Sequence, residues 1–214
     1  ASDVYKRQMR SAFLTGEDIH AVTASQVFGI PLDEVTPQMR SHAKAVNFGI
    51  VYGISAFSLA QDIGVRPKEA QAYIDAYLEK YHGVREYMEK VISQAKHDGY
   101  VSTLFGRRRP MPELKSPNRN MRAFGERVAR NMPIQGTAAD IMKLAMVNAH
   151  RRMQAEGLQS RLILQVHDEL IAECPEDEAE QVKKLLEEEM SGAVSLSVPL
   201  TANAKTGHSW AEAH

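Results

Sequence analysis

The chain contains little of three things that mark particular classes of protein. Its 214 residues include one cysteine, Cys174, which excludes an internal disulfide and a cysteine-based zinc cluster. No apolar run approaches transmembrane length, and we expect no secretory signal. The formal net charge is only −1, so the overall charge indicates no particular partner. The length of 214 residues suits one large domain or two small ones, and the single cysteine favours the cytoplasm.

Charge is nevertheless distributed unevenly along the chain. Between residues 173 and 190, eight acidic residues outnumber two lysines, which is typical of a solvated helix. Between residues 100 and 133 only two acidic residues oppose a set of basic ones, and this predicts a surface that faces phosphate. The basic set comprises Arg107, Arg108, Arg109, Lys115, Arg119, Arg122, Arg127 and Arg130.

Helical patterns dominate the first part of the chain. Thr36 is a good N-cap and Pro37 suits the first helical position, so a helix is predicted to begin there and to end at Gly53. Gly49 lies inside this helix, where a missing side chain would let a ligand approach closely. The spacing of apolar residues predicts four further helices, over residues 17–28, 67–81, 84–98 and 120–156.

Several finer expectations follow from these patterns. The helices over 67–81 and 84–98 are expected to pack as an antiparallel pair with their tyrosines in the core. Pro133 should kink the long helix, because proline removes a backbone donor. Residues 100–114, with LFGRRRP at their centre, read as a loop or short hairpin. Residues 1–8, ASDVYKRQ, join no pattern, and we expect a non-native leader there.

The pattern changes to mixed structure after about residue 160. Two short β-type runs, RLILQV and ELIAEC, are separated by His167 and Asp168 alone, which predicts a tight hairpin although the turn lacks the usual glycine. An acidic amphipathic helix is expected over residues 176–190 and a final strand over 198–205. The chain as a whole is therefore predicted to be α+β and mainly helical.

A stripe on the helix over residues 37–52 is the strongest functional signal. Each four-residue step along an α-helix rotates only ~40° past a full turn and rises ~6 Å, so residues at this spacing share one face. Cations suit a triphosphate and aromatic planes suit a sugar and base, which together favour a nucleoside triphosphate site. The alternative is a solvated cation pair beside core aromatics. The stripe comprises Arg40, Lys44, Phe48 and Tyr52, followed by Gly53.

Two further groups of polar residues carry weaker signals. Asp168, with Glu169 beside it, lies at the expected hairpin tip, where a carboxylate can hold a divalent cation with open coordination positions. An aspartate in an ordinary turn is the alternative. Arg127, Asn131 and Gln135 are spaced at i, i+4, i+8, so they present donors suited to phosphate, sugar and base edges along one helix face. The alternative for these three residues is an ordinary polar helix face with no ligand.

Taken in this order, the three groups resemble the polymerase region of family A DNA polymerases, of the bacterial polymerase I type. The stripe matches motif B of that family, R-x3-K-x3-F-x3-Y-G, and QVHDEL matches its motif C. TLFGRRRP, NMPIQGTAADIMKLAM and the ending GHSWAEAH are also similar. Phe48 favours this family over the related single-subunit RNA polymerases, which resemble R-x3-K-x2-M-x3-Y-G. The likeness covers residues 13–214.

The resemblance implies a role for each member of the stripe. Arg40 and Lys44 would hold the triphosphate of the incoming dNTP. Phe48 would lie against its sugar and base. Tyr52, with Gly53, would close the pocket near the templating base.

The resemblance also implies roles in metal and DNA binding. Asp168 would be a catalytic carboxylate that binds Mg²⁺, with Glu169 assisting. His167 would lie by the primer terminus. The primer–template would be contacted by Arg127, Asn131 and Gln135.

A further implication concerns what the chain contains. Residues 9–160 would be the helical fingers subdomain and residues 161–214 the end of an antiparallel palm sheet. Motif A, a strand resembling DYSQIELR, is expected upstream of Gly16 and is absent, so only part of a two-Mg²⁺ site is expected here.

The resemblance therefore predicts a fragment of a template-directed DNA polymerase, inactive by itself. Primer–template DNA and dNTPs would be its partners, with no membrane. The parent would act as a monomer in the cytoplasm at the bacterial nucleoid. The alternative function is a nucleotide- or DNA-binding remnant without catalysis.

Overall fold

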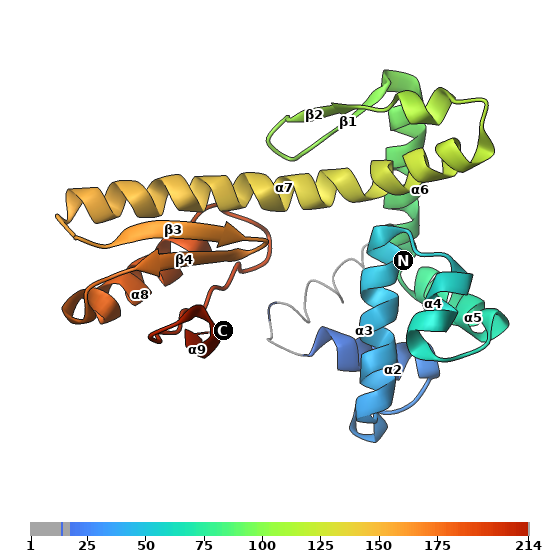
Figure 1. Cartoon of the computed structure of the whole chain (residues 1–214). Helices are drawn as coiled ribbons and strands as arrows, with labels where there is room; N and C mark the ends of the chain where they lie inside the picture. The colour runs from blue at the N-terminus through green and yellow to red at the C-terminus, as the bar shows by residue number, and fades with distance from the viewer. Residues whose placement is uncertain (1–13, 15–17, 214) are drawn as a thin grey trace. The chain divides into compact units, whose positions relative to one another are not determined.

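The computed structural model describes residue 14 and residues 18–213. The expected leader over residues 1–8 and the start of the first expected helix lie outside the described residues. The fold is α+β, as predicted, with helices accompanied by two small antiparallel sheets (Figure 1). Two compact units divide the chain, Ala1–Ile134 and Gln135–His214. No described helix is long and apolar enough to span a membrane.

The first unit opens with helices that surround the predicted stripe helix, α3. Thr36 Oγ1 accepts a hydrogen bond from Met39 N (3.2 Å), and Gly53 ends α3 in the left-handed conformation at φ 70°. Both predicted ends of this helix are therefore confirmed. The elements of this unit up to α6 are α2 (Ile19–Phe28), η1 (Leu32–Glu34), α3 (Pro37–Tyr52), α4 (Ala56–Ile63), α5 (Pro67–Lys80) and α6 (His82–Asp98).

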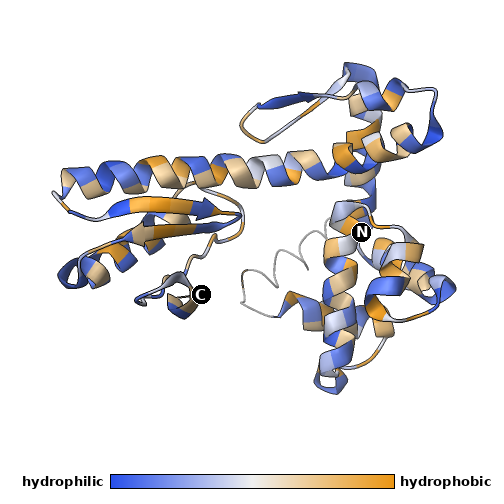
Figure 2. Ribbon diagram, viewed as in Figure 1, coloured by the Kyte–Doolittle hydropathy of each residue, from blue (hydrophilic) through white to orange (hydrophobic). Residues whose placement is uncertain are grey.

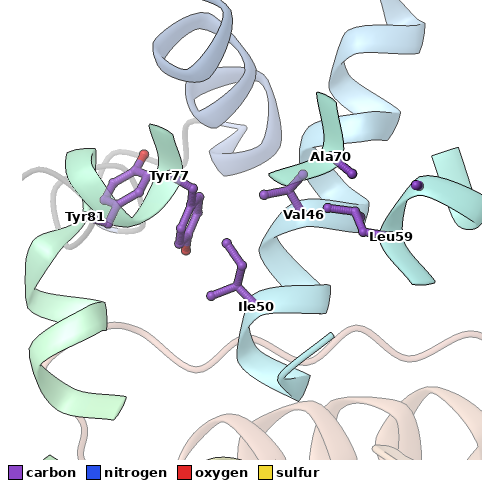
Figure 3. Packing of buried hydrophobic residues seen from close by; sticks show 7 residues of the cluster. Val46, Ile50, Leu59, Ala70, Tyr77 and Tyr81 are labelled. Atoms are coloured by element: carbon purple, nitrogen blue, oxygen red, sulfur yellow. The ribbon is translucent and has the colours of Figure 1, made fainter. Parts of the chain in front are cut away.

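The core of this unit gathers beneath the inner face of α3. Figure 3 shows Val46 and Ile50 of α3 facing Leu59 of α4 and Tyr77 of α5. Tyr77 and Tyr81 are buried, which confirms that these tyrosines belong to the core. Their burial also raises the pKa of both phenols.

The expected antiparallel pairing of α5 with α6 is wrong. Tyr81 alone joins the two helices, which is too short a connection for the chain to reverse and pack one helix along the other. Helix α5 packs mainly against α4 and α2 instead. The apolar stripe of each helix was correctly recognised, but its partner depends on contacts that local periodicity does not encode.

The rest of this unit is a hairpin followed by the start of a long helix. Strands β1 (Tyr100–Ser102) and β2 (Arg108–Pro110) pair antiparallel. Of the loop and the short hairpin expected for this segment, the hairpin is therefore the one that forms. The connection η2 (Pro112–Lys115) leads into α7 (Arg119–Ala155). Helix α7 continues through Pro133 without a break, and the kink expected at this proline stays a prediction.

The second unit contains the end of α7 and the predicted tight hairpin. Strands β3 (Arg161–Val166) and β4 (Glu169–Glu173) are antiparallel, with an irregularity of register between Leu162 and Leu164. Apolar residues of α7, the hairpin and α8 (Ala179–Ser191) form its core, as the hydrophobic colour of the strands in Figure 2 suggests. Short turns complete the unit, namely η3 (Glu176–Glu178) and α9 (Trp210–Ala213).

The β3–β4 sheet has only two strands among the described residues. Strand β3 exposes Ile163 and Leu164, which are neighbours in sequence. The irregular register at this point interrupts the regular alternation of side chains, and both residues leave apolar surface open on this strand.

The predicted final strand over residues 198–205 is wrong. The segment has no regular structure. The backbone N–H groups of Ala202 and Ala204 donate instead to Ser191 Oγ (3.0 Å) and to Glu187 Oε1 (2.8 Å) of α8. Side chains of a neighbouring helix thus satisfy donors that a sheet would otherwise pair.

Candidate functional site

The predicted stripe lies on one exposed face of α3. Arg40 and Lys44 are exposed near its beginning, while Phe48 is 47% and Tyr52 44% exposed near its end. The two rings are nearly parallel, with centroids 6.3 Å apart and planes 10° apart. The helix therefore presents cations and a short aromatic surface in the predicted order, while its opposite face is buried in the core.

Asp18 modifies the cationic end of the stripe. Its carboxylate accepts hydrogen bonds from the backbone N–H of His20 (3.0 Å) and of Ala21 (3.2 Å), and so it caps α2. The same carboxylate forms an ion pair with Arg40. The bond from Arg40 and the backbone donors together lower the pKa of Asp18. Arg40 is thus held at a defined place on the surface.

His20 extends the stripe from a neighbouring helix. Its ring centroid lies 5.8 Å from that of Phe48, and its Nδ1 is 3.0 Å from Asn47 Nδ2. Burial lowers the pKa of His20, and the positive charges of Arg40 and Lys44 lower it further against the opposing effect of Asp18. The ring therefore favours the neutral form beside the cations.

Asp18 and His20 were missed by the sequence reasoning. Both lie about twenty residues before the stripe, so no helical spacing connects them to it. The only available signal was Asp18 as an N-cap candidate, and this would not have revealed its contact with Arg40.

Gly49 serves a different purpose from the one expected. A Cβ at this position would lie 2.6 Å from Ile54 Cγ2, and Ile54 N donates to Gly49 O (2.7 Å). The space left by the missing side chain is therefore filled by Ile54, where the chain folds back after the left-handed Gly53. The close approach is made by the protein itself and not by a ligand.

An open cleft of about 630 Å³ adjoins the aromatic end of the stripe. Arg127 of α7 reaches this cleft, and a Cβ on Gly53 would lie 3.2 Å from Arg127 Cγ. Gly53 therefore both ends α3 and admits an arginine from a segment more than seventy residues away. The lining residues are Ala45, Phe48, Gly49, Tyr52, Gly53, Ile54, Ser55, Ser58, Asp62 and Arg127.

The second predicted group lies on α7. Arg127 is exposed, and its guanidinium lies 5.9 Å from the ring centroid of Phe124. Asn131 is half-buried, and its Oδ1 has no hydrogen-bond partner among the described residues. Gln135 is exposed and belongs to the second compact unit. The cleft thus brings Arg127 to the stripe, a proximity that the helical spacing did not indicate.

The third predicted group occupies the turn between β3 and β4. Val166 pairs with Glu169, so His167 and Asp168 form a two-residue turn as expected. His167 adopts φ 50° in place of the usual glycine, and its carbonyl accepts from Gln165 Nε2 (2.7 Å). Asp168 is exposed and Glu169 half-buried. The turn therefore presents the carboxylate of Asp168 at its tip, and Glu169 follows it at the start of β4.

These two carboxylates suit a hard cation such as Mg²⁺ in charge and ligand type. A full set of protein ligands is not assembled around them. Within residues 18–213, no three His, Cys, Asp or Glu side chains gather closely enough to hold one metal ion. The turn can contribute part of a metal site.

One α+β chain thus carries a helix with exposed cations and aromatic rings in its first unit and a turn with two carboxylates in its second. The chain belongs to DNA polymerase family A, whose model matches residues 2–212. This confirms the family resemblance inferred from the motifs.

Bacterial proteins are among the curated relatives of the chain. The chain is 54% identical over 203 residues to DNA polymerase I of Pseudomonas aeruginosa and 52% identical over 202 residues to that of Bacillus subtilis. These matches cover 95% and 94% of the chain but only 22% and 23% of the relatives. The chain thus spans about a quarter of the length of such proteins.

A solved structure agrees with the fold of the chain. The polymerase domain of Pol1 from M. smegmatis, in complex with DNA primer-template and dNTP, matches with a TM-score of 0.89 and 46% identity. The match covers 96% of this chain and 36% of that one.

Proposed function

We propose that the whole protein to which this chain corresponds synthesises DNA on a template. The primer 3′-hydroxyl attacks the α-phosphate of a dNTP, and pyrophosphate leaves. The observation that carries the proposal is the exposed face of α3, where two cations precede two stacked aromatic rings in a chain of family A. Support comes from the M. smegmatis relative, which was solved with primer-template and dNTP.

The cationic end of α3 is suited to the triphosphate. Arg40 offers a planar set of donors and Lys44 a compact ammonium, and both are exposed on the same part of α3. The His20 ring lies 5.8 Å from that of Phe48 and is influenced by both cations, so a neutral ring there can donate one hydrogen bond without adding charge.

The aromatic end is suited to the nucleoside. The exposed faces of Phe48 and Tyr52 lie beside the open cleft, so a sugar and base can pack there without displacing a buried side chain. Gly53, which ends α3, lines the same cleft.

The polar face of α7 is proposed to contact the primer–template. Arg127, at the cleft, would hold a phosphate. Gln135 is exposed and can contact sugar or base edges. Asn131 is proposed to contact them too, although its Oδ1 is buried in this structure.

The β3–β4 turn is proposed to contribute to the metal site. Asp168 and Glu169 would hold part of the Mg²⁺ binding set, and His167 would lie by the primer terminus. When bound, the metal supplies the positive charge that activates the attacking oxygen and stabilises the leaving one. Family A polymerases generally depend on metal.

We further propose that residues 9–160 act as the fingers and residues 161–214 as part of the palm. The whole protein would work as a monomer in the cytoplasm at the nucleoid. A chain of these 214 residues by itself is expected to be inactive, because Asp168 and Glu169 supply only one side of a two-metal site.

A nucleotide- or DNA-binding remnant without catalysis is the second candidate. It is favoured by the incomplete set of carboxylates among the described residues. The upstream coding sequence distinguishes the two candidates. An aspartate-bearing strand of motif A encoded there would identify a polymerase and exclude the remnant.

Primer extension by the whole protein tests the proposal. Labelled primer–template, four dNTPs and Mg²⁺ should give extension that Asp168→Asn abolishes, because the amide keeps the shape but removes the charge. Asp177→Asn is the matched control, since Asp177 is also exposed but lies in η3. Retained extension by Asp168→Asn, or equal loss in both variants, would refute the role of the turn. No extension by the wild type would favour the remnant.

A further inference from the structure

The tip of the β1–β2 hairpin exposes two large apolar side chains. Leu104 is 70% and Phe105 47% exposed. They are the central residues of a turn closed by Gly106 N donating to Thr103 O (3.0 Å). Such positions normally carry glycine, proline, asparagine or another small polar residue. The turn therefore has no local need for a leucine and a phenylalanine.

The tip is held firmly although it is exposed. Thr103 is buried, its N donates to Arg107 O (2.9 Å), and its Oγ1 accepts from Arg107 N (3.1 Å). At the base, Val101 and Met111 are buried in the cluster beneath the hairpin. An aromatic ring on such a support can bind with little loss of conformational entropy.

Positive charge accompanies the apolar tip. Residues 100–110 contain three arginines and no acidic residue. The guanidinium of Arg108 lies 4.5 Å from the ring centroid of Tyr100, and this contact fixes its position on the exposed strand. Figure 2 shows the strongly hydrophilic colour of β2 next to the hydrophobic colour of the turn.

We propose that this hairpin is a contact for single-stranded nucleic acid, separate from the α3 cleft. Phe105 stacks on a base, and Arg107 and Arg108 lie along the phosphates on either side. An exposed aromatic ring beside arginines is the combination that binds single strands without reading sequence. Charge decides against a basic or neutral apolar partner, because residues 100–110 hold three arginines and no acidic residue. The exposed aromatic ring beside them favours stacked bases over an acid-rich protein surface.

The identity of the strand rests on the proposed function. In a protein that copies DNA, the single strand available is the template that has not yet been paired. The hairpin would then hold template beyond the nucleotide being copied.

Binding of the whole protein to two DNAs tests the hairpin. Both share one duplex, and the template extends past the primer by one nucleotide in the first and by about ten in the second, within the span of known single-strand sites. Fluorescence anisotropy gives each Kd without nucleotide or metal. Phe105→Ala should reduce the gain in affinity from the longer overhang by about 5-fold or more, as expected for one lost stack.

Three further variants make the result specific. Phe105→Trp should restore the gain, because it keeps the stacking surface. Arg108→Ala should lower the salt dependence of binding to the long overhang by about 0.7 in log–log slope. Tyr87→Ala removes an equally exposed aromatic residue from α6 and should leave the gain intact.

The proposal would be overturned if Phe105→Ala kept the full increase in affinity that the longer overhang gives the wild type. A loss confined to binding of anionic phospholipid vesicles would overturn it too, and would assign the tip to a membrane. Failure of the wild type to extend a primer would count against the proposed function, whereas the overhang measurement needs no extension and judges the hairpin alone.

Discussion

Lys44 offers the clearest test of the nucleotide site. Its side chain is exposed on α3, and it forms no ion pair or hydrogen bond with any residue that the structure describes. Arg40, by contrast, is paired with Asp18. Removing the ammonium of Lys44 therefore deletes no internal contact, and any loss of function reports on the ligand.

The expected magnitude follows from the loss of one charge-assisted contact. Such a contact contributes about 1.5–3 kcal/mol, so kcat/KM for dNTP should fall about 10- to 150-fold in Lys44→Ala. The free energy of unfolding should stay within about 0.5 kcal/mol of the wild type, as for other exposed positions. Lys44→Arg should lose less, because it keeps the charge.

Single-nucleotide incorporation by the whole protein, measured over a range of dNTP concentrations, gives these values. Lys68→Ala is the matched control, since Lys68 is equally exposed but lies at the start of α5. The reasoning is refuted if Lys44→Ala retains the nucleotide dependence of the wild type, or if Lys68→Ala loses as much.

Three other predictions test the site and its support. Gly49→Ala should destabilise the protein, because overpacking against Ile54 costs about 1–3 kcal/mol and outweighs the gain of about 1 kcal/mol in helix propensity. Denaturant unfolding should show a smaller loss of stability when Ile54→Ala is also present. If the stability changes of the two substitutions simply add, the contact is contradicted. The lowered pKa of His20 means that its contribution to stability is full above pH 6.5 and is lost as the pH falls below it; an NMR titration midpoint at or above 6.5 would disprove this. Arg127→Ala should weaken primer–template binding across sequences and reduce the salt slope by about 0.9, whereas an unaltered slope would indicate a packing role at Gly53.

Local rules predicted α3 well because its ends and its stripe are encoded by neighbouring residues. Thr36, Pro37 and Gly53 act within one turn of the helix ends, so their effect can be read without knowing the fold. The exposure of Phe48 and Tyr52 on the face opposite Val46 also follows from helical period alone.

The unpredicted features depend on residues that meet only after folding. Asp18 reaches Arg40 from another helix, and Arg127 reaches Gly53 across more than seventy residues. Ile54 fills the space beside Gly49 because the chain reverses after α3, which a helical pattern ending at Gly53 does not describe. Periodicity specifies which face of an element is apolar but not which segment covers it.

The exposed edge of strand β3 has a practical consequence for handling this chain. Among the described residues, strand β3 pairs only with β4, so its other edge, beside exposed Ile163 and Leu164, is a template onto which a strand of another molecule can add. The 214 residues expressed by themselves should therefore associate as their concentration rises, and the association should begin at this edge. A charged residue at position 163 should raise the solubility limit of the chain. One surface substitution would then give a preparation concentrated enough for spectroscopy.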